Sequence, residues 1–206
     1  MNIIDTNDIK KIKKLIKKKP NKIIFYDGFN HKLKKNMIHN KLIYLKFDKS
    51  FFNKKIKKNI LPHSLKILIF AGHFDQKIKA NVLPPFLEQL ELNGNYNKKI
   101  KKNILPYNLK KLIFGNNFNQ KIKKNTLPIN LQEIIFGKLF DKQIKKNILP
   151  NNLQSIILHN NFNKKIKKNV FPNSLLSLNF GLSTPNIFYF DYIYNFKKSS
   201  FPPNLQ

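Results

Sequence analysis

The hydrophobic pattern of the chain repeats every 22 residues between Phe52 and Gly181. Each unit contains an aromatic residue, an isoleucine four residues later and a proline six residues after that. The prolines are Pro62, Pro84, Pro106, Pro128, Pro150 and Pro172, and the aromatic residues are Phe52, Phe74, Tyr96, Phe118, Phe140 and Phe162. Self-similarity at a fixed period of this length is typical of a repeat solenoid.

The second half of each unit predicts a short strand. After the proline the spacing is x-x-Leu-x-x-Leu-x-Phe, as at Leu65, Leu68 and Phe70, and its last two apolar positions alternate as they do in a strand. Gly or Asn then turns the chain. Because one unit is too small to bury its own apolar side, we expect the coils to stack and their strands to pair in a parallel ladder, about 4.8 Å apart. The predicted fold is a mainly β, leucine-rich-repeat-like solenoid with one short parallel strand per repeat.

Two further features of the repeat, an asparagine column and the proline, are predicted to be architectural. An invariant asparagine column lies between the isoleucine and the proline, at Asn59, Asn81, Asn103, Asn125, Asn147 and Asn169. The inner turns of a coil leave backbone groups without ladder partners, so we expect these amides to satisfy them within the stack. The proline suits the turn that enters the strand, because no N–H is required there.

The N-terminal segment, residues 1–20, is predicted to be an amphipathic cap helix. Ile9, Ile12, Leu15 and Ile16 share one helical face, and Pro20 ends the pattern. Such a helix would cover the first coil, as solenoids require. The alternative is a basic amphipathic segment that binds a membrane or directs the chain to the nucleus.

The remaining chain divides into three segments. Residues 21–47 hold degenerate repeats, and residues 48–181 hold the six regular ones. The period fails in residues 182–206, which are aromatic-rich and restart the proline motif at Phe201. This last segment is either a C-terminal cap or a truncated repeat.

The unit Phe118-Asn119, Ile122, Pro128 resembles the FNIP repeat, a 22-residue relative of the leucine-rich repeat found in social amoebae and in giant viruses that infect amoebae. The likeness covers residues 29–181. It implies a right-handed, curved solenoid used for protein recognition. Many family members carry an N-terminal F-box, which implies substrate capture for ubiquitin ligation. This chain departs there, because only about 20 residues precede its first predicted strand and an F-box needs roughly twice as many.

Charge adds a second hypothesis. The chain has 40 lysines, no arginine and 10 acidic residues, a formal net charge of +30. Such a balance favours nucleic acid or an anionic membrane as partner. The alternative is a coding bias, because Lys, Asn, Ile, Phe and Tyr all have A/T-rich codons. The missing arginine favours that alternative, since lysine cannot form bidentate contacts with bases.

Several classes of function and compartment are excluded or disfavoured. The absence of cysteine excludes disulfides and thiolate metal sites. The five histidines occupy four repeat registers, and no carboxylate is placed to orient them, so neither an enzyme nor a cofactor or metal site is expected. No apolar run reaches the length of a membrane span, and the N-terminus lacks a hydrophobic signal region. An intracellular location is expected, in the cytoplasm or alternatively the nucleus.

Two candidate binding surfaces remain. The first is the outward side of the strand ladder, where an unidentified protein partner would bind. Its candidate residues are Ile67, Ile69, Glu91, Lys111, Ile113, Glu133, Ile135 and Ile157. A contiguous apolar stripe of this kind is typical of an interaction face, although β-propensity alone would also produce it.

The second surface is a stacked lysine ladder beside the repeat isoleucine. Its candidate residues are Lys98, Lys99, Lys101, Lys102, Lys164, Lys165, Lys167 and Lys168. Like charges stacked this closely repel, and a polyanion such as nucleic acid, or an anionic membrane, would relieve the repulsion. A solvated face that only keeps the solenoid in solution is the alternative.

Overall fold

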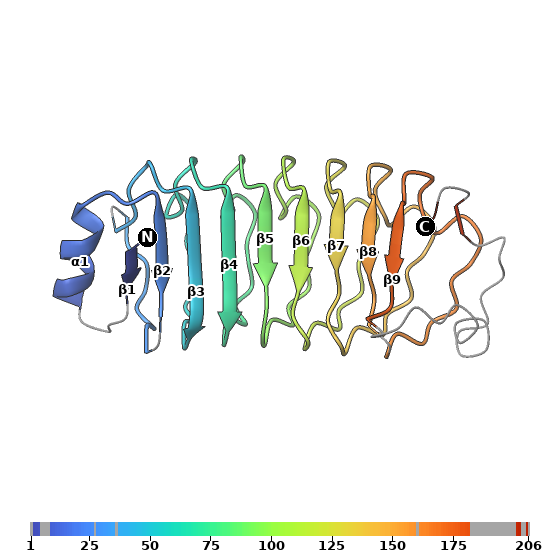
Figure 1. Cartoon of the computed structure of the whole chain (residues 1–206), viewed down its shortest axis with the longest axis horizontal. Coiled ribbons are helices and arrows are strands. Elements are labelled where there is room, and N and C mark those ends of the chain that lie inside the picture. The colour runs from blue at the N-terminus through green and yellow to red at the C-terminus, as the bar shows by residue number, and fades with distance from the viewer. Residues whose placement is uncertain are drawn as a thin grey trace.

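The structure, a computed structural model, describes residues 2–4, 9–26, 28–35, 37–159, 161–181, 201–202 and 205. Its elements are β1 (Asn2–Ile4), α1 (Ile9–Lys17), β2 (Lys22–Phe25), β3 (Tyr44–Ser50), β4 (Ile67–Gly72), β5 (Gln89–Leu92), β6 (Lys111–Phe114), β7 (Glu133–Ile135), β8 (Ser155–Ile157) and β9 (Ser177–Asn179). The strands form one parallel sheet in chain order, from β1 to β9 (Figure 1). The predicted β-solenoid is confirmed.

Strand register reproduces the sequence period. Leu68 pairs with Leu90, Leu90 with Leu112, and the same column continues through Ile134, Ile156 and Leu178. From Leu68 to Ile156 these side chains are fully buried, so the alternation predicted for the strand is correct. Equal coil length therefore places equivalent side chains directly above one another.

Stacked aromatic rings fill the space behind the sheet. The ring that ends a strand lies against the ring four residues later, with centroids 4.0 Å apart for Phe70 and Phe74 and 3.7 Å for Phe114 and Phe118. Both rings of each pair are at most 3% exposed. Offset stacking of this kind adds to the free energy that burial of the rings already supplies.

Each coil is a wedge, narrower at the sheet than behind it. Successive rings at the strand ends lie 5.4, 5.3 and 5.6 Å apart where both are phenylalanine. In the second aromatic column, from Phe29 to Phe162, the spacing is 5.9 to 6.3 Å. Paired strands are closer still, at about 4.8 Å. The stack therefore curves, with the sheet on its concave side.

A ladder of side-chain oxygens links the coils behind the aromatic column. The residue after each column aromatic is Asn or Asp, and its side-chain oxygen accepts a hydrogen bond from the backbone N–H of the equivalent residue one coil later. The six links join Asn30 to Asn53, Asn53 to Asp75, Asp75 to Asn97, Asn97 to Asn119, Asn119 to Asp141 and Asp141 to Asn163, at 2.8 to 3.1 Å. These backbone donors have no strand partner, so the ladder satisfies groups that would otherwise be orphaned.

The invariant asparagine column has a different role from the one predicted. Asn59, Asn81 and their four equivalents are exposed, and their backbone φ values lie between 60° and 63°. Asparagine tolerates this left-handed conformation better than most residues. The prediction that these amides satisfy buried backbone groups is wrong, and the column instead turns the chain. The repeat proline opens the turn into the strand as predicted: the N–H of Leu65, for example, donates to the Pro62 carbonyl at 3.1 Å.

The N-terminal segment, residues 1–20, which is predicted to be a cap helix, also contains a strand. Residues 2–4 form β1, which pairs in parallel with β2 from Asn2↔Ile23 to Ile4↔Phe25. Among the described residues of this segment, Ile9–Lys17 is helical, as the pattern from Ile9 to Ile16 predicts, with Ile12 and Ile16 buried. The helix α1 lies beside β1 at this end of the row (Figure 1). Its capping role, like the right-handed sense of the coil, stays a prediction.

The C-terminal segment lies largely outside the described residues. Where it is described, Phe201 stacks on Phe171 with centroids 6.1 Å apart, and the N–H of Leu205 donates to the Pro202 carbonyl at 3.3 Å. This is the proline turn of the regular coils, one level further on.

Glycine occurs where the backbones of neighbouring coils approach most closely. A Cβ atom at Gly115 would lie 2.4 Å from the Gly94 nitrogen, and one at Gly137 would lie 2.0 Å from the Gly115 oxygen. Both contacts are with backbone, which cannot move aside as a side chain can. Stacking at these levels therefore requires glycine for steric reasons.

Gly115→Ala should destabilise the chain by roughly 1–3 kcal/mol, because the added methyl group overpacks this contact. The φ of Gly115 is not positive, so backbone conformation adds no separate penalty. For a chain of this size the melting temperature should fall by about 2–4 °C per kcal/mol, measured by circular dichroism. Asn116→Ala, at the exposed next position, is the control and should melt like the parent chain. Equal melting of both variants contradicts the steric argument.

Asn97→Leu should cost about 1–3 kcal/mol, because it removes the oxygen that accepts from the Asn119 N–H at 3.0 Å and from the Gln120 amide at 2.9 Å. Asn97→Asp keeps an acceptor and should retain most of the stability. Urea unfolding of the two variants measures the difference. A leucine variant as stable as the aspartate variant would show that the ladder adds nothing.

Candidate functional site

The outward side of the sheet is more covered than its sequence suggests. Ile69 is only 7% exposed, and Ile67, Ile113, Ile135 and Ile157 are half-buried. The side chains crowd because the sheet is the concave side of the stack, where the coils lie closest. The predicted stripe exists along the face, but as a partly covered surface.

Charge on this sheet face is balanced. Lys111 binds Glu133 at 2.8 Å, and Lys46 binds Asp48 at 2.9 Å. Both oxygens of Glu91 accept hydrogen bonds, from the Gln89 amide at 2.6 Å and the Asn93 amide at 2.9 Å. A face with paired charges and half-buried isoleucines does not attract a polyanion, but it offers a surface that another protein can cover.

A more exposed apolar surface lies at the edge where the strands begin. Three consecutive coils present Phe86, Tyr107 and Ile129, which are 58%, 66% and 53% exposed. They follow the repeat prolines by one or two positions, and Pro85 beside them is also exposed. We call Pro85, Phe86, Tyr107 and Ile129 the apolar rim. Exposed apolar side chains on neighbouring elements mark a contact surface more strongly than isolated ones.

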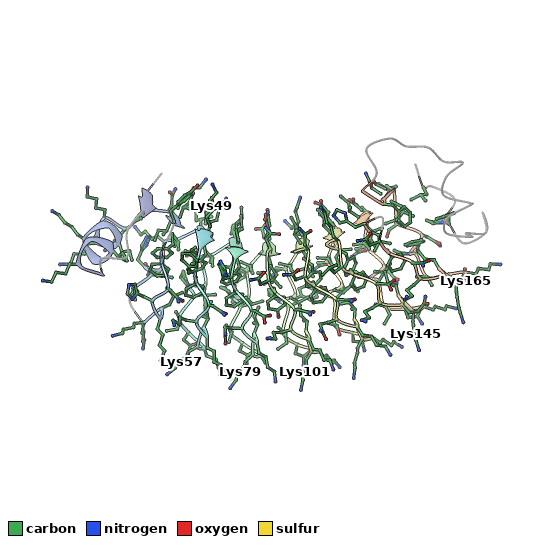
Figure 2. All side chains as sticks on the ribbon, turned by 90° about the horizontal axis from the view of Figure 1, so that it is seen from below. Lys49, Lys57, Lys79, Lys101, Lys145 and Lys165 are labelled. Atoms are coloured by element: carbon green, nitrogen blue, oxygen red, sulfur yellow. The ribbon has the colours of Figure 1, made fainter. Side chains whose placement is uncertain are left out.

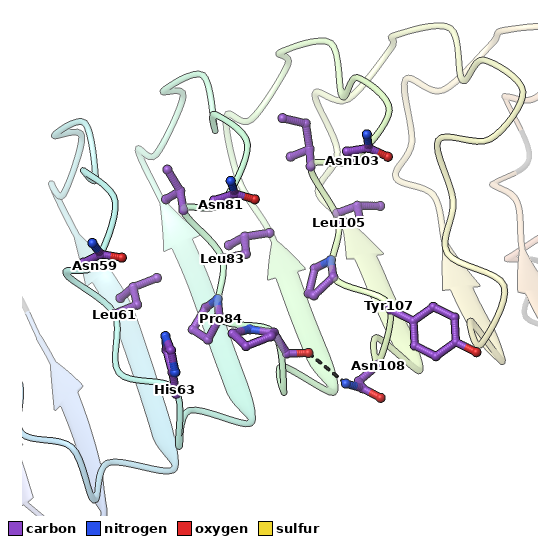
Figure 3. Close-up of a pocket in the computed structure, with 14 residues that line it drawn as sticks. Asn59, Leu61, His63, Asn81, Leu83, Pro84, Asn103, Leu105, Tyr107 and Asn108 are labelled. Carbon is purple, nitrogen blue, oxygen red and sulfur yellow. Dashed lines mark hydrogen bonds between the residues drawn. The ribbon is translucent and has the colours of Figure 1, made fainter.

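The rim is held by hydrogen bonds between coils. The Asn108 side-chain amide donates to the Pro85 carbonyl at 2.9 Å, and the Asn130 amide donates to the Tyr107 carbonyl at 3.2 Å. Beside the rim runs a groove of about 550 Å³, with Leu83 and Leu105 on its floor (Figure 3). A preorganised apolar platform next to a groove suits recognition because little ordering is needed on binding.

The sequence pattern did not indicate the rim. The first position after the repeat proline holds His63, Pro85, Tyr107, Ile129, Asn151 and Asn173. Because the residue type at this position varies from coil to coil, it forms no conserved column that would identify a surface. In one coil the exposed aromatic residue is instead Phe86, at the second position after the repeat proline. The available signal was the variation itself, since bulky apolar residues at an otherwise variable turn position have no architectural reason to be there.

Two of the lysine-ladder candidates have structural partners. Lys98 binds Asp75, and Lys164 binds Asp141 at 2.6 Å, each reaching back to the preceding coil. Burial raises the pKa of the Asp141 carboxyl, but the hydrogen bonds from Lys164 and from the Asn163 backbone hold that pKa below its usual value. These two lysines neutralise acidic members of the ladder and are not available to a polyanion.

The other six candidates are exposed. Lys99, Lys101, Lys102, Lys165, Lys167 and Lys168 flank inward-facing isoleucines at the back of the stack. Figure 2 shows Lys57, Lys79, Lys101, Lys145 and Lys165 pointing away from the strands. The structure therefore separates the two predicted surfaces onto opposite sides of the solenoid.

Among the described residues, no group of three or more acidic or histidine side chains could hold a metal ion. The described part of the chain also contains no helix that is long and apolar enough to cross a membrane.

The sequence matches the model of the FNIP repeat over residues 52–95, 96–139 and 140–183. The fold resembles the crystal structure of CroV588, described as a novel circular LRR protein, with a TM-score of 0.72 and 35% sequence identity. That alignment covers 90% of this chain and 30% of CroV588, so the chain spans less than a third of that relative. No curated protein matches the sequence.

Repeat proteins with this leucine-rich-repeat-like fold are typically non-catalytic scaffolds for interaction. Three consecutive matches, each two coils long, together account for more than half of the residues. The chain belongs to the FNIP repeat family.

Proposed function

We propose that this chain is a non-catalytic module that binds another protein across the apolar rim and the adjoining sheet face. The observation that carries the proposal is the exposure of Phe86, Tyr107 and Ile129 on three consecutive coils. Large aromatic side chains on a rigid platform are the usual anchors of protein interfaces. The charged residues beside them are paired, which favours a protein over a highly charged partner.

The rim and the sheet face adjoin one another. Tyr107 lies four residues before Lys111, where β6 begins, so one partner can span both surfaces. Between them Glu88 binds Lys66 at 2.7 Å and Lys110 at 3.0 Å across three coils. These two lysines lower the pKa of Glu88, so its carboxylate stays ionised between them and offsets one of their two charges. Apolar anchors surrounded by paired polar groups match the anatomy of a protein interface.

Tyr107→Ser with Ile129→Ser should weaken binding of the partner at least about tenfold, the effect of losing roughly 1.4 kcal/mol. The partner is first identified by affinity purification from the native cell and mass spectrometry, and its affinity is then measured by titration. The matched control is Phe51→Ser with Leu139→Ser, which removes residues that are 54% and 51% exposed and follow the strands instead of preceding them. If the rim variant binds as tightly as this control, the proposed surface is wrong.

Ile113→Lys with Ile135→Lys tests the sheet face separately. Two new charges among half-buried isoleucines should abolish binding of a partner that covers this face, while the circular dichroism spectrum should show that the solenoid stays folded. Retained binding in this variant, together with loss in the rim variant, would exclude the sheet face from the interface.

A further inference from the structure

Lysine is not spread evenly over the exposed positions of the coil. In the six regular coils, three exposed columns flank the inward isoleucine: the positions one before, one after and two after it. Sixteen of these eighteen positions hold lysine, and Ala80 and Gln143 are the exceptions. The same columns continue one coil earlier at Lys32, Lys34 and Lys35, which are also exposed. We call these three columns the lysine band.

Two other outward surfaces hold almost no lysine. The first position after the repeat proline is exposed in all six coils and is never lysine. The two outward positions of β4 to β9 contain one lysine in twelve, at Lys111. The column two before the inward isoleucine is intermediate, with four lysines in six, of which Lys98 and Lys164 pair with ladder aspartates. A coding bias toward lysine would act on exposed positions of every column alike, so it does not explain sixteen lysines in eighteen band positions against one in eighteen on these two surfaces, and the band reflects a requirement for charge.

The charge of the band is uncompensated. Within the described residues, the acidic partners Asp48, Asp75, Glu88, Glu133 and Asp141 all form ion pairs with lysines of other columns. Equivalent aromatic positions of adjacent coils lie 5.9 to 6.3 Å apart, which is well within a Debye length of about 8 Å. Neighbouring band lysines therefore repel one another, and bound anions would relieve that repulsion.

We propose that the lysine band binds nucleic acid through its phosphodiester backbone, without sequence preference. The band contains neither arginine, which would read base edges bidentately, nor aromatic residues, on which bases would stack. The surface is convex, so a planar membrane would touch only the coils at its crest, whereas an extended strand of phosphates can follow several coils. A chain of regularly spaced charges is the polyanion that fits columns with one lysine per coil.

The band lies opposite the sheet face, so a nucleic acid bound there leaves that part of the proposed protein interface open (Figure 2). A protein and a nucleic acid can therefore occupy the chain together. The inference goes beyond the proposed function, and failure of either leaves the other standing.

The test is fluorescence anisotropy of the full chain with a labelled 20-nucleotide single strand and a 20-base-pair duplex of mixed sequence. Binding is expected at 50 mM salt, with affinity falling about a hundredfold or more at 200 mM, as for four or more phosphate contacts. Comparison of the two probes shows which form of the backbone is preferred. Two base compositions should give equal affinities.

Position is separated from net charge by two matched triple variants. Lys101→Gln, Lys123→Gln and Lys145→Gln remove three charges from one band column and should weaken binding at least about tenfold, with a shallower salt dependence. Lys41→Gln, Lys49→Gln and Lys138→Gln remove the same charge from exposed positions outside the band and should change affinity less than about threefold.

Two results would overturn the proposal. The first is no binding of either probe at 50 mM salt, and the second is an equal loss in both triple variants. If neither probe binds but the chain floats with phosphatidylserine vesicles, the band is assigned to a membrane instead.

Discussion

The structure depends on coils of equal length meeting their neighbours in register. The buried leucine column, the stacked rings, the oxygen ladder and the glycine contacts each connect one coil only to the next. Where the length departs from 22 residues, a bulge in strand β3 absorbs the departure. The strand-end rings Phe47 and Phe70 are 23 residues apart, and the register of β3 shifts between Phe47 and Ser50. Lys49 takes a φ of 44° there, so one extra residue is accommodated without displacing any column.

The fold could be predicted because periodicity and strand alternation survive in a single sequence. The roles of the two asparagine columns could not, because both have the same period. Their composition does distinguish them in retrospect. The ladder column admits aspartate at Asp75 and Asp141, since its role is to accept hydrogen bonds, whereas the turn column is asparagine in all six coils and adopts a left-handed backbone. The strand β1 could not be predicted because an isolated three-residue segment, Asn2–Ile4, carries no periodic signal of its own.

Cross-coil pairing also explains part of the variation along the chain. The position two before the inward isoleucine is lysine in both coils that follow a ladder aspartate, where Lys98 binds Asp75 and Lys164 binds Asp141. After a ladder asparagine it is glutamine at Gln76 and Gln120, which bond to Asn53 and Asn97, and lysine at Lys54 and Lys142. A slipped stack that placed a glutamine coil after Asp75 or Asp141 would leave the carboxylate without its lysine, and this favours the native order.

The wedge shape of the coil determines the character of both outer surfaces. Close spacing at the sheet crowds the outward side chains, so Ile69, which lies between Lys46 and Glu91 in register, is buried. On the convex side the coils lie farther apart, so lysines of neighbouring coils are better separated there than they would be on the strands. A lysine column on the concave face would place its charges at the strand spacing of about 4.8 Å, the least favourable distance in the molecule. The curvature that brings the sheet strands together thus also spaces the uncompensated lysines on the opposite side, so one geometric constraint gives the two surfaces opposite properties.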